Sequence, residues 1–176
     1  MATIETAVLA EMLRESLRQG QTPRLTVSSG SMAPLLQVGD QIVLEAVAPE
    51  KLAVGDIVTV GAAAVVMTHR FWGRVDVGGR PYLLTRGDRP LIFDDPWPQE
   101  ALIGRVNGRF RHNHYLDLTT GTGQRLNRRL RQLAEWEADL WGSPPQRPRL
   151  RRIVRALVYG WARLLAGLSD MKIRWL

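Results

Sequence analysis

The stretch RVDVGGRPYLLT, from Arg74 to Thr85, is the clearest local signal of fold in the sequence. A short apolar run stands on each side of two consecutive glycines, Gly78 and Gly79. Glycine adopts positive φ without steric cost, so this pair suits the two-residue turn of a β-hairpin. The stretch therefore predicts strands over Arg74–Val77 and Tyr82–Thr85, joined by a tight turn.

Further short apolar runs stand before and after this hairpin in the sequence. Gly-Asp, Gly-Gly and Pro signals separate them, as turns separate strands. The spacing predicts a mainly β domain. The further predicted strands are Arg24–Val27, Gln41–Val47, Asp56–Val60, Val65–His69, Leu102–Phe110 and Tyr115–Leu118.

Helical periodicity appears at the two ends of the chain. Residues 4–19 form one predicted amphipathic helix, with Gly20 where a C-terminal cap belongs. Its apolar residues at helical spacing are Ile4, Val8, Met12, Leu13 and Leu17. The predicted organisation is an amphipathic helix over 1–22, a β-rich domain over 23–119 and a basic helical tail over 120–176.

The tail is predicted to contain two helices. Residues 123–141 form the first, and the prolines of residues 143–148 interrupt the pattern because proline cannot continue a helical hydrogen-bond ladder. The second helix spans 149–168 and carries most of its arginines away from one apolar stripe. That stripe comprises Leu150, Ile153, Val154, Leu157, Trp161, Leu164, Leu165 and Leu168.

The charge of the chain is concentrated in the tail. Residues 1–106 hold 10 Lys+Arg against 12 Asp+Glu, whereas residues 107–176 hold 14 against 5, within a formal net charge of +7. Such asymmetry indicates a polyanionic partner for the tail. An anionic membrane surface meeting residues 149–168 is one interpretation. The other is that both helices fold back on the β domain. Nucleic acid is not expected, because few aromatic residues are interleaved with the arginines for base stacking.

The N-terminal residues argue against export and against a membrane span. Glu5, Glu11, Arg14, Glu15 and Arg18 interrupt the apolar residues of the first helix. We therefore expect a cytoplasmic or peripherally membrane-associated protein. With no cysteine in the sequence, a thiolate zinc site, a disulfide framework and a cysteine nucleophile are excluded.

The stretch VSSGSMAPLLQVGD, residues 27–40, contains the candidate nucleophile Ser31. A serine hydroxyl needs a base within hydrogen-bond reach and donors for the developing oxyanion. His69 ends a predicted strand and can supply the base. Asp88, Asp94 and Asp95 follow in a loop where a carboxylate can orient the imidazole.

The ordered motifs SGSMAP (29–34), GDQIVLE (39–45), GDIVTV (55–60), HR (69–70), TRGD (85–88), DD (94–95) and IGRV (103–106) resemble the type I signal peptidase superfamily. The branch with a catalytic histidine, found in archaea and the endoplasmic reticulum, is the most similar. The resemblance covers residues 26–106 and implies a signal-peptidase or repressor-protease-like β fold. A lysine base is disfavoured, because Lys51 precedes GDIVTV whereas the family base follows that strand.

The resemblance also implies roles for individual residues. Ser31 becomes the nucleophile and His69 the general base, with either Asp94 or Asp95 as the orienting aspartate. Ser29 becomes an oxyanion donor, and Asp88 supports the site. Unlike the family's usual members, this chain shows no membrane-spanning helix before the serine.

The expected function is therefore a serine endopeptidase that cleaves extended peptides after small residues. The alternative is a catalytically silent module that keeps the fold and binds a peptide or a membrane surface. No cofactor is expected, and His112 with His114 lacks the further ligands that a metal site needs.

Overall fold

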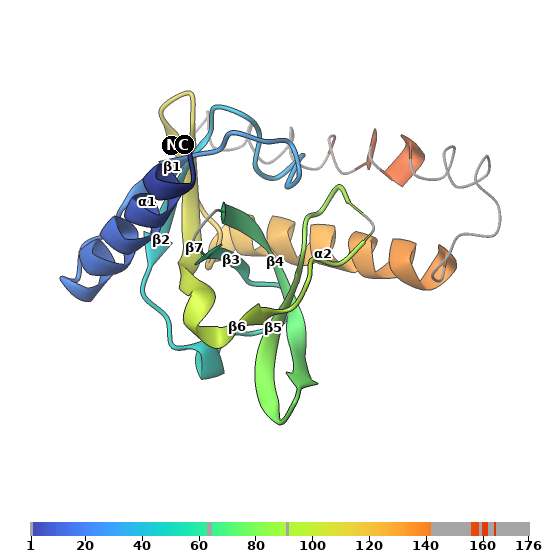
Figure 1. Cartoon of the computed structure of the whole chain (residues 1–176). Helices are drawn as coiled ribbons and strands as arrows, with labels where there is room; N and C mark the ends of the chain where they lie inside the picture. The colour runs from blue at the N-terminus through green and yellow to red at the C-terminus, as the bar shows by residue number, and fades with distance from the viewer. Residues whose placement is uncertain are drawn as a thin grey trace.

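The computed structural model describes residues 2–62, 65–90 and 92–141, together with residues 156–158, 160, 161 and 164. One antiparallel sheet dominates these residues and confirms the mainly β class (Figure 1). Its strands are β1 (Arg24–Thr26), β2 (Gln41–Glu45), β3 (Ile57–Ala62), β4 (Val65–Val77), β5 (Arg80–Arg86), β6 (Trp97–Pro98), β7 (Leu102–Arg111) and β8 (His114–Asp117). The helices are α1 (Ala2–Arg18) and α2 (Gly121–Trp141), with short 3-10 turns η1 (Pro49–Lys51) and η2 (Gln99–Ala101).

The strands follow the order β1-β2-β7-β3-β4-β5-β6, with β8 beside β7. One edge of β7 pairs with β2. The opposite edge is shared between β3, which pairs with the first half of β7, and β8, which pairs with the second half. This central strand therefore links both halves of the sheet.

Strand β4 is longer than the sequence predicts. The runs Val65–His69 and Arg74–Val77 belong to one 13-residue strand, with an irregularity between Phe71 and Gly73. Gly73 has a φ of +140°, so glycine accommodates the bend. Residues 65–70 of β4 pair with β3, and residues 70–77 pair with β5.

The predicted Gly78-Gly79 hairpin is confirmed. Both glycines have positive φ, +63° and +80°, between the paired residues Val77 and Arg80. His112 and Asn113 form a similar turn between β7 and β8, with φ values of +47° and +64°. Strand β6 was not predicted, since two residues that include a proline carry no periodic signal.

Helix α1 ends as predicted. Gly20 has a φ of +75°, its N–H donates to the carbonyl of Leu17, and the N–H of Gln21 donates to the carbonyl of Ser16. These are the two hydrogen bonds of a Schellman cap. The buried side of α1 differs from the predicted stripe, because Val8 and Met12 are exposed whereas Ala10, Leu13 and Leu17 are buried.

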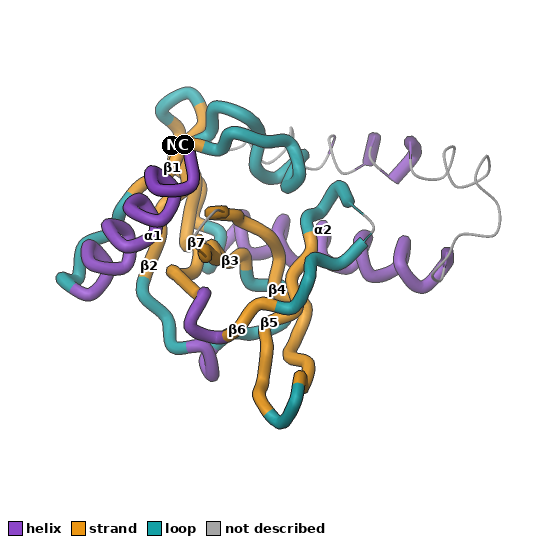
Figure 2. The backbone as a smooth tube through the Cα atoms, viewed as in Figure 1, coloured by secondary structure: helices purple, strands orange, loops and turns teal. Residues whose placement is uncertain are grey.

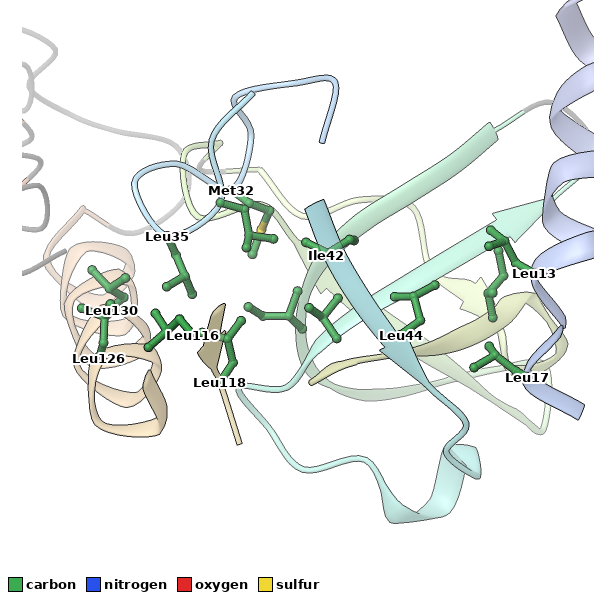
Figure 3. Close-up of a cluster of buried hydrophobic side chains, with 14 of the residues drawn as sticks. Leu13, Leu17, Met32, Leu35, Ile42, Leu44, Leu116, Leu118, Leu126 and Leu130 are labelled. Carbon is green, nitrogen blue, oxygen red and sulfur yellow. The ribbon is translucent and has the colours of Figure 1, made fainter. Parts of the chain in front are cut away.

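The main hydrophobic cluster joins both helices to the sheet. Figure 3 shows Leu13 and Leu17 of α1 at one end, Ile42 and Leu44 of β2 in the middle, and Leu126 and Leu130 of α2 at the other end. The first helix of the predicted tail therefore packs on the β domain. The second predicted helix, 149–168, lies largely outside the described residues. In the described part of the chain, no helix combines the length and apolar character needed to cross a bilayer.

Candidate active site

Ser31 lies in the loop between β1 and β2, and buried side chains hold this loop in place. Met32, Leu35 and Leu36 of the same loop belong to the main hydrophobic cluster. At its end, Arg111 donates from Nε and Nη2 to the two carboxylate oxygens of Asp40, at 2.8 and 2.7 Å. The loop therefore presents Ser31 from an ordered support, although it has no regular secondary structure.

His69 of β4 lies beside Ser31. The Nε2 atom of His69 is 3.0 Å from the Oγ atom of Ser31, and the imidazole is almost fully buried. Its other nitrogen, Nδ1, is 2.6 Å from Oδ2 of Asp94. Because a carboxylate only accepts hydrogen bonds, the proton of a neutral imidazole lies on Nδ1, and Nε2 accepts from the serine hydroxyl.

The structure brings Asp94, and not Asp95, to the imidazole. The N–H of Asp94 donates to the carbonyl of Thr85 at 3.0 Å, and the Thr85 hydroxyl donates to Oδ2 of Asp94 at 2.6 Å. Asp95 is exposed. Thr85 is a positioning residue that the sequence analysis did not identify, although it stands in the TRGD motif.

Ser29 lies on the other side of the candidate nucleophile. Its Oγ atom is 3.2 Å from Oγ of Ser31. Since the Ser31 hydroxyl is directed at His69, the Ser29 hydroxyl is the donor in this contact. A hydroxyl in this place can donate to an oxyanion that develops next to Ser31.

Asp88 supports the site through Arg70. Both of its carboxylate oxygens accept from the guanidinium of Arg70 at 2.7 Å, and the Arg70 side chain is completely buried. Arg70 also donates to the carbonyl of Gly55 at 2.8 Å and to the side-chain oxygen of Asn127 in α2. This paired and hydrogen-bonded charge holds the loop after β5 against β4 and α2.

Gly87 is a second residue whose importance the sequence analysis missed. A Cβ atom at this position would lie 2.9 Å from the carbonyl oxygen of Ser31 and 3.1 Å from Nε2 of His69. Two residues later in the same loop, Arg89 donates its N–H to the carbonyl of Ser31 at 2.8 Å. The loops after β1 and β5, drawn in teal in Figure 2, therefore meet at the site, and only glycine permits this approach.

A cleft of about 510 Å³ opens beside Ser31 and His69. Its walls are the segment 25–32 on one side and the first part of β4, residues 65–69, on the other. Of the described residues that line it, none is Asp, Glu, Lys or Arg. The cleft therefore suits an uncharged extended segment.

The candidate lysine base and the candidate metal-ligating histidines lie outside the cleft beside Ser31. Lys51 ends η1, before β3, and His112 and His114 belong to the β7–β8 turn and the start of β8. Among the described residues, no group of three or more His, Asp or Glu side chains is arranged to hold a metal ion.

No model of a protein family matches the chain, and a search of curated proteins finds no significantly similar sequence.

Proposed function

We propose that this protein is a serine endopeptidase with Ser31 as nucleophile, His69 as general base and Asp94 as the residue that orients the imidazole. The contact series from Asp94 to His69 to Ser31, at 2.6 and 3.0 Å, is the observation that carries the proposal. The ordered motifs from Ser29 to Val106 support membership of the type I signal peptidase superfamily, which is part of the same proposal.

The proposed chemistry follows from these contacts. The Oγ atom of Ser31 attacks the carbonyl carbon of the scissile bond while its proton passes to Nε2 of His69. The carboxylate of Asp94 stabilises the imidazolium, and the Ser29 hydroxyl donates to the oxyanion. His69 then delivers the proton to the leaving amine. Water, activated by the same imidazole, hydrolyses the acyl ester and restores Ser31.

The sheet offers a place for the substrate backbone. In the described strand pairings, residues 65–69 of β4 pair only with β3, so the other edge of this segment faces the cleft. An extended peptide can add to this edge through main-chain hydrogen bonds while its side chains enter the cleft. Cleavage after small residues is the specificity that the resemblance implies.

Peptide hydrolysis by purified variants tests the proposal. Ser31→Ala removes the nucleophile and is expected to lower kcat by about 10³-fold or more. Ser16→Ala is the matched control, because Ser16 lies on α1 outside the cleft and its hydroxyl donates only to the side chain of Gln21 among the described contacts. Hydrolysis by Ser31→Ala at the wild-type rate would overturn the proposal.

The two adjacent aspartates provide a sharper comparison. Asp94→Asn removes the charge beside His69 and is expected to lower kcat by about 10²–10⁴-fold. Asp95→Asn makes the same change one residue away, at an exposed side chain, and should leave kcat unchanged. Peptide binding in the cleft without hydrolysis would favour the silent binding module instead.

We also propose that the tail meets an anionic membrane surface through residues 149–168. Three apolar side chains of this range, Leu157, Trp161 and Leu164, are exposed among the described residues. The arginines of the range supply the complementary charge. Peripheral association with a membrane would then place the cleft near membrane-bound or membrane-inserting peptides.

A further inference from the structure

Helix α1 lies outside the motifs of the candidate site, yet it is fixed against the sheet next to the cleft. The buried Ala10 lies next to Gly61 of β3: a Cβ on Gly61 would be 3.4 Å from Cβ of Ala10, which is an ordinary van der Waals contact. Arg14 adds a hydrogen bond from Nη2 to the carbonyl of Gly61, at 2.9 Å. This hydrogen bond and the burial of Ala10 hold α1 against β3 beside the cleft.

Leu9, the residue before Ala10 on α1, lies at the cleft. It lines the same cavity as Ser31 and His69, and it is 40% exposed. Gly61 pairs with Val66 of β4, so the adjacent turn of α1 lies at the level of Val66. His69 follows Val66 by three residues, which corresponds to about 10 Å along a strand.

We propose that Leu9 is a specificity-determining residue that selects an apolar side chain of the substrate, three or four residues from the scissile bond. An extended peptide that adds to β4 rises by the same distance per residue as the strand. Its residue at the level of Val66 therefore contacts Leu9, in a cleft whose described lining carries no Asp, Glu, Lys or Arg. The inference rests on the proposed peptidase function.

A charge exchange between enzyme and substrate tests this contact. The probe is a series of synthetic peptides based on one that the wild type cleaves. Six positions in total are varied, on both sides of the scissile bond, and each position carries Leu, Lys or Glu in turn. Leu9→Glu is expected to lower kcat/KM about tenfold for Leu at the selected position, mainly by raising KM. For Lys at that position, Leu9→Glu should exceed the wild type by about tenfold.

Two further variants separate contact from a change in the fold. Leu9→Gln is polar but uncharged, so it should lose the preference for Leu without gaining one for Lys. Val8→Glu places the same charge on the neighbouring residue of α1, which is exposed but does not line the cleft. Its specificity profile should superpose on that of the wild type.

The outcomes distinguish this inference from the proposed function. If the wild type cleaves peptides and the Leu9→Glu profile equals the wild-type profile at every position, Leu9 does not select the substrate. The same conclusion follows if Val8→Glu gains the preference for Lys equally, because bulk charge on α1 would then explain it. If the wild type cleaves no peptide, the peptidase proposal fails and the role of Leu9 fails with it.

Discussion

Phe93 directly precedes Asp94, and its aromatic ring helps to position the Asp94 carboxylate. Its ring meets Trp72 edge-on, with 6.1 Å between ring centroids. The guanidinium of Arg86 lies 4.4 Å from the ring centroid of Trp72 and 5.1 Å from that of Phe93. Arg86 also donates to the carbonyl of Ala134 in α2, at 3.2 Å. The aromatic pair and the cation therefore anchor the loop that places Asp94.

We expect Phe93→Ala to lower kcat about tenfold with little change in KM. An aromatic pair and a cation–π contact each contribute about 0.5–1.5 kcal/mol, and 1.4 kcal/mol corresponds to tenfold. Steady-state kinetics of peptide hydrolysis would measure kcat and KM.

The neighbouring residue supplies the control for this prediction. Ile92 is 83% exposed and precedes Phe93 in the same loop, so Ile92→Ala should leave kcat and KM unchanged. Phe93→Tyr keeps an aromatic ring and should retain most of the activity. Equal losses in Ile92→Ala and Phe93→Ala would show that general loop disorder, and not the ring contact, explains the effect.

Single residues of the site differ in how far the sequence could predict them. The motifs were sufficient to select Ser31 and His69, but they left Asp94 and Asp95 equivalent. The choice depends on a backbone hydrogen bond from Asp94 to Thr85, which no spacing rule encodes. Gly87 stands in the TRGD motif, but spacing does not show why glycine is needed there, because two of the three atoms nearest to a Cβ at this position belong to Ser31 and His69, distant in the sequence.

At the scale of elements, turn chemistry was more informative than strand length. The Gly78-Gly79 hairpin and the Gly20 cap follow from local φ preferences and are confirmed. The continuity of β4 across Gly73 was missed, because a glycine inside a strand pattern also indicates an interruption. Pairing with β5 on both sides of the bend maintains the strand.

The start of α2 depends on Asp117 at the end of β8. Its carboxylate accepts hydrogen bonds from the N–H and hydroxyl groups of Thr119 and Thr120, at 2.7 to 3.0 Å. Burial alone would raise the pKa of the Asp117 carboxyl, but these hydrogen bonds outweigh it and hold the pKa below its ordinary value. The ionised carboxylate therefore stabilises the turn that leads into α2.

We expect Asp117→Asn to lower the free energy of unfolding by about 1–3 kcal/mol at pH 7. Because the folded-state pKa is lowered, the contribution is complete above the unfolded pKa of about 4 and is lost as the pH falls through the folded pKa. The difference between wild type and variant should therefore shrink between about pH 5 and pH 2. Urea denaturation across this range measures it, with Asp95→Asn as the control at an exposed carboxylate. A difference that stays constant with pH would contradict this assignment.

For the whole molecule, α2 is part of the support of the candidate site. Its apolar residues complete the cluster shown in Figure 3, and its Asn127 and the carbonyl of Ala134 accept from Arg70 and Arg86. Arg70 in turn holds Asp88. The sequence separates this helix from the following basic segment by prolines, but it could not show whether either helix packs on the β domain. An amphipathic stripe packs equally well on a sheet or on a membrane surface.

This division of the tail can be tested by shortening the chain. A protein of residues 1–141 keeps α2 and the whole main hydrophobic cluster, so it should fold and cleave soluble peptides as the full chain does.

The shortened protein lacks residues 149–168 and should lose binding to vesicles of phosphatidylglycerol and phosphatidylcholine. Each basic residue near an anionic surface contributes about 1 kcal/mol, so binding by the full chain should weaken with salt and be absent on pure phosphatidylcholine. Vesicle co-sedimentation measures this difference. Equal binding by both proteins would show that the membrane contact belongs to the folded domain and not to residues 149–168.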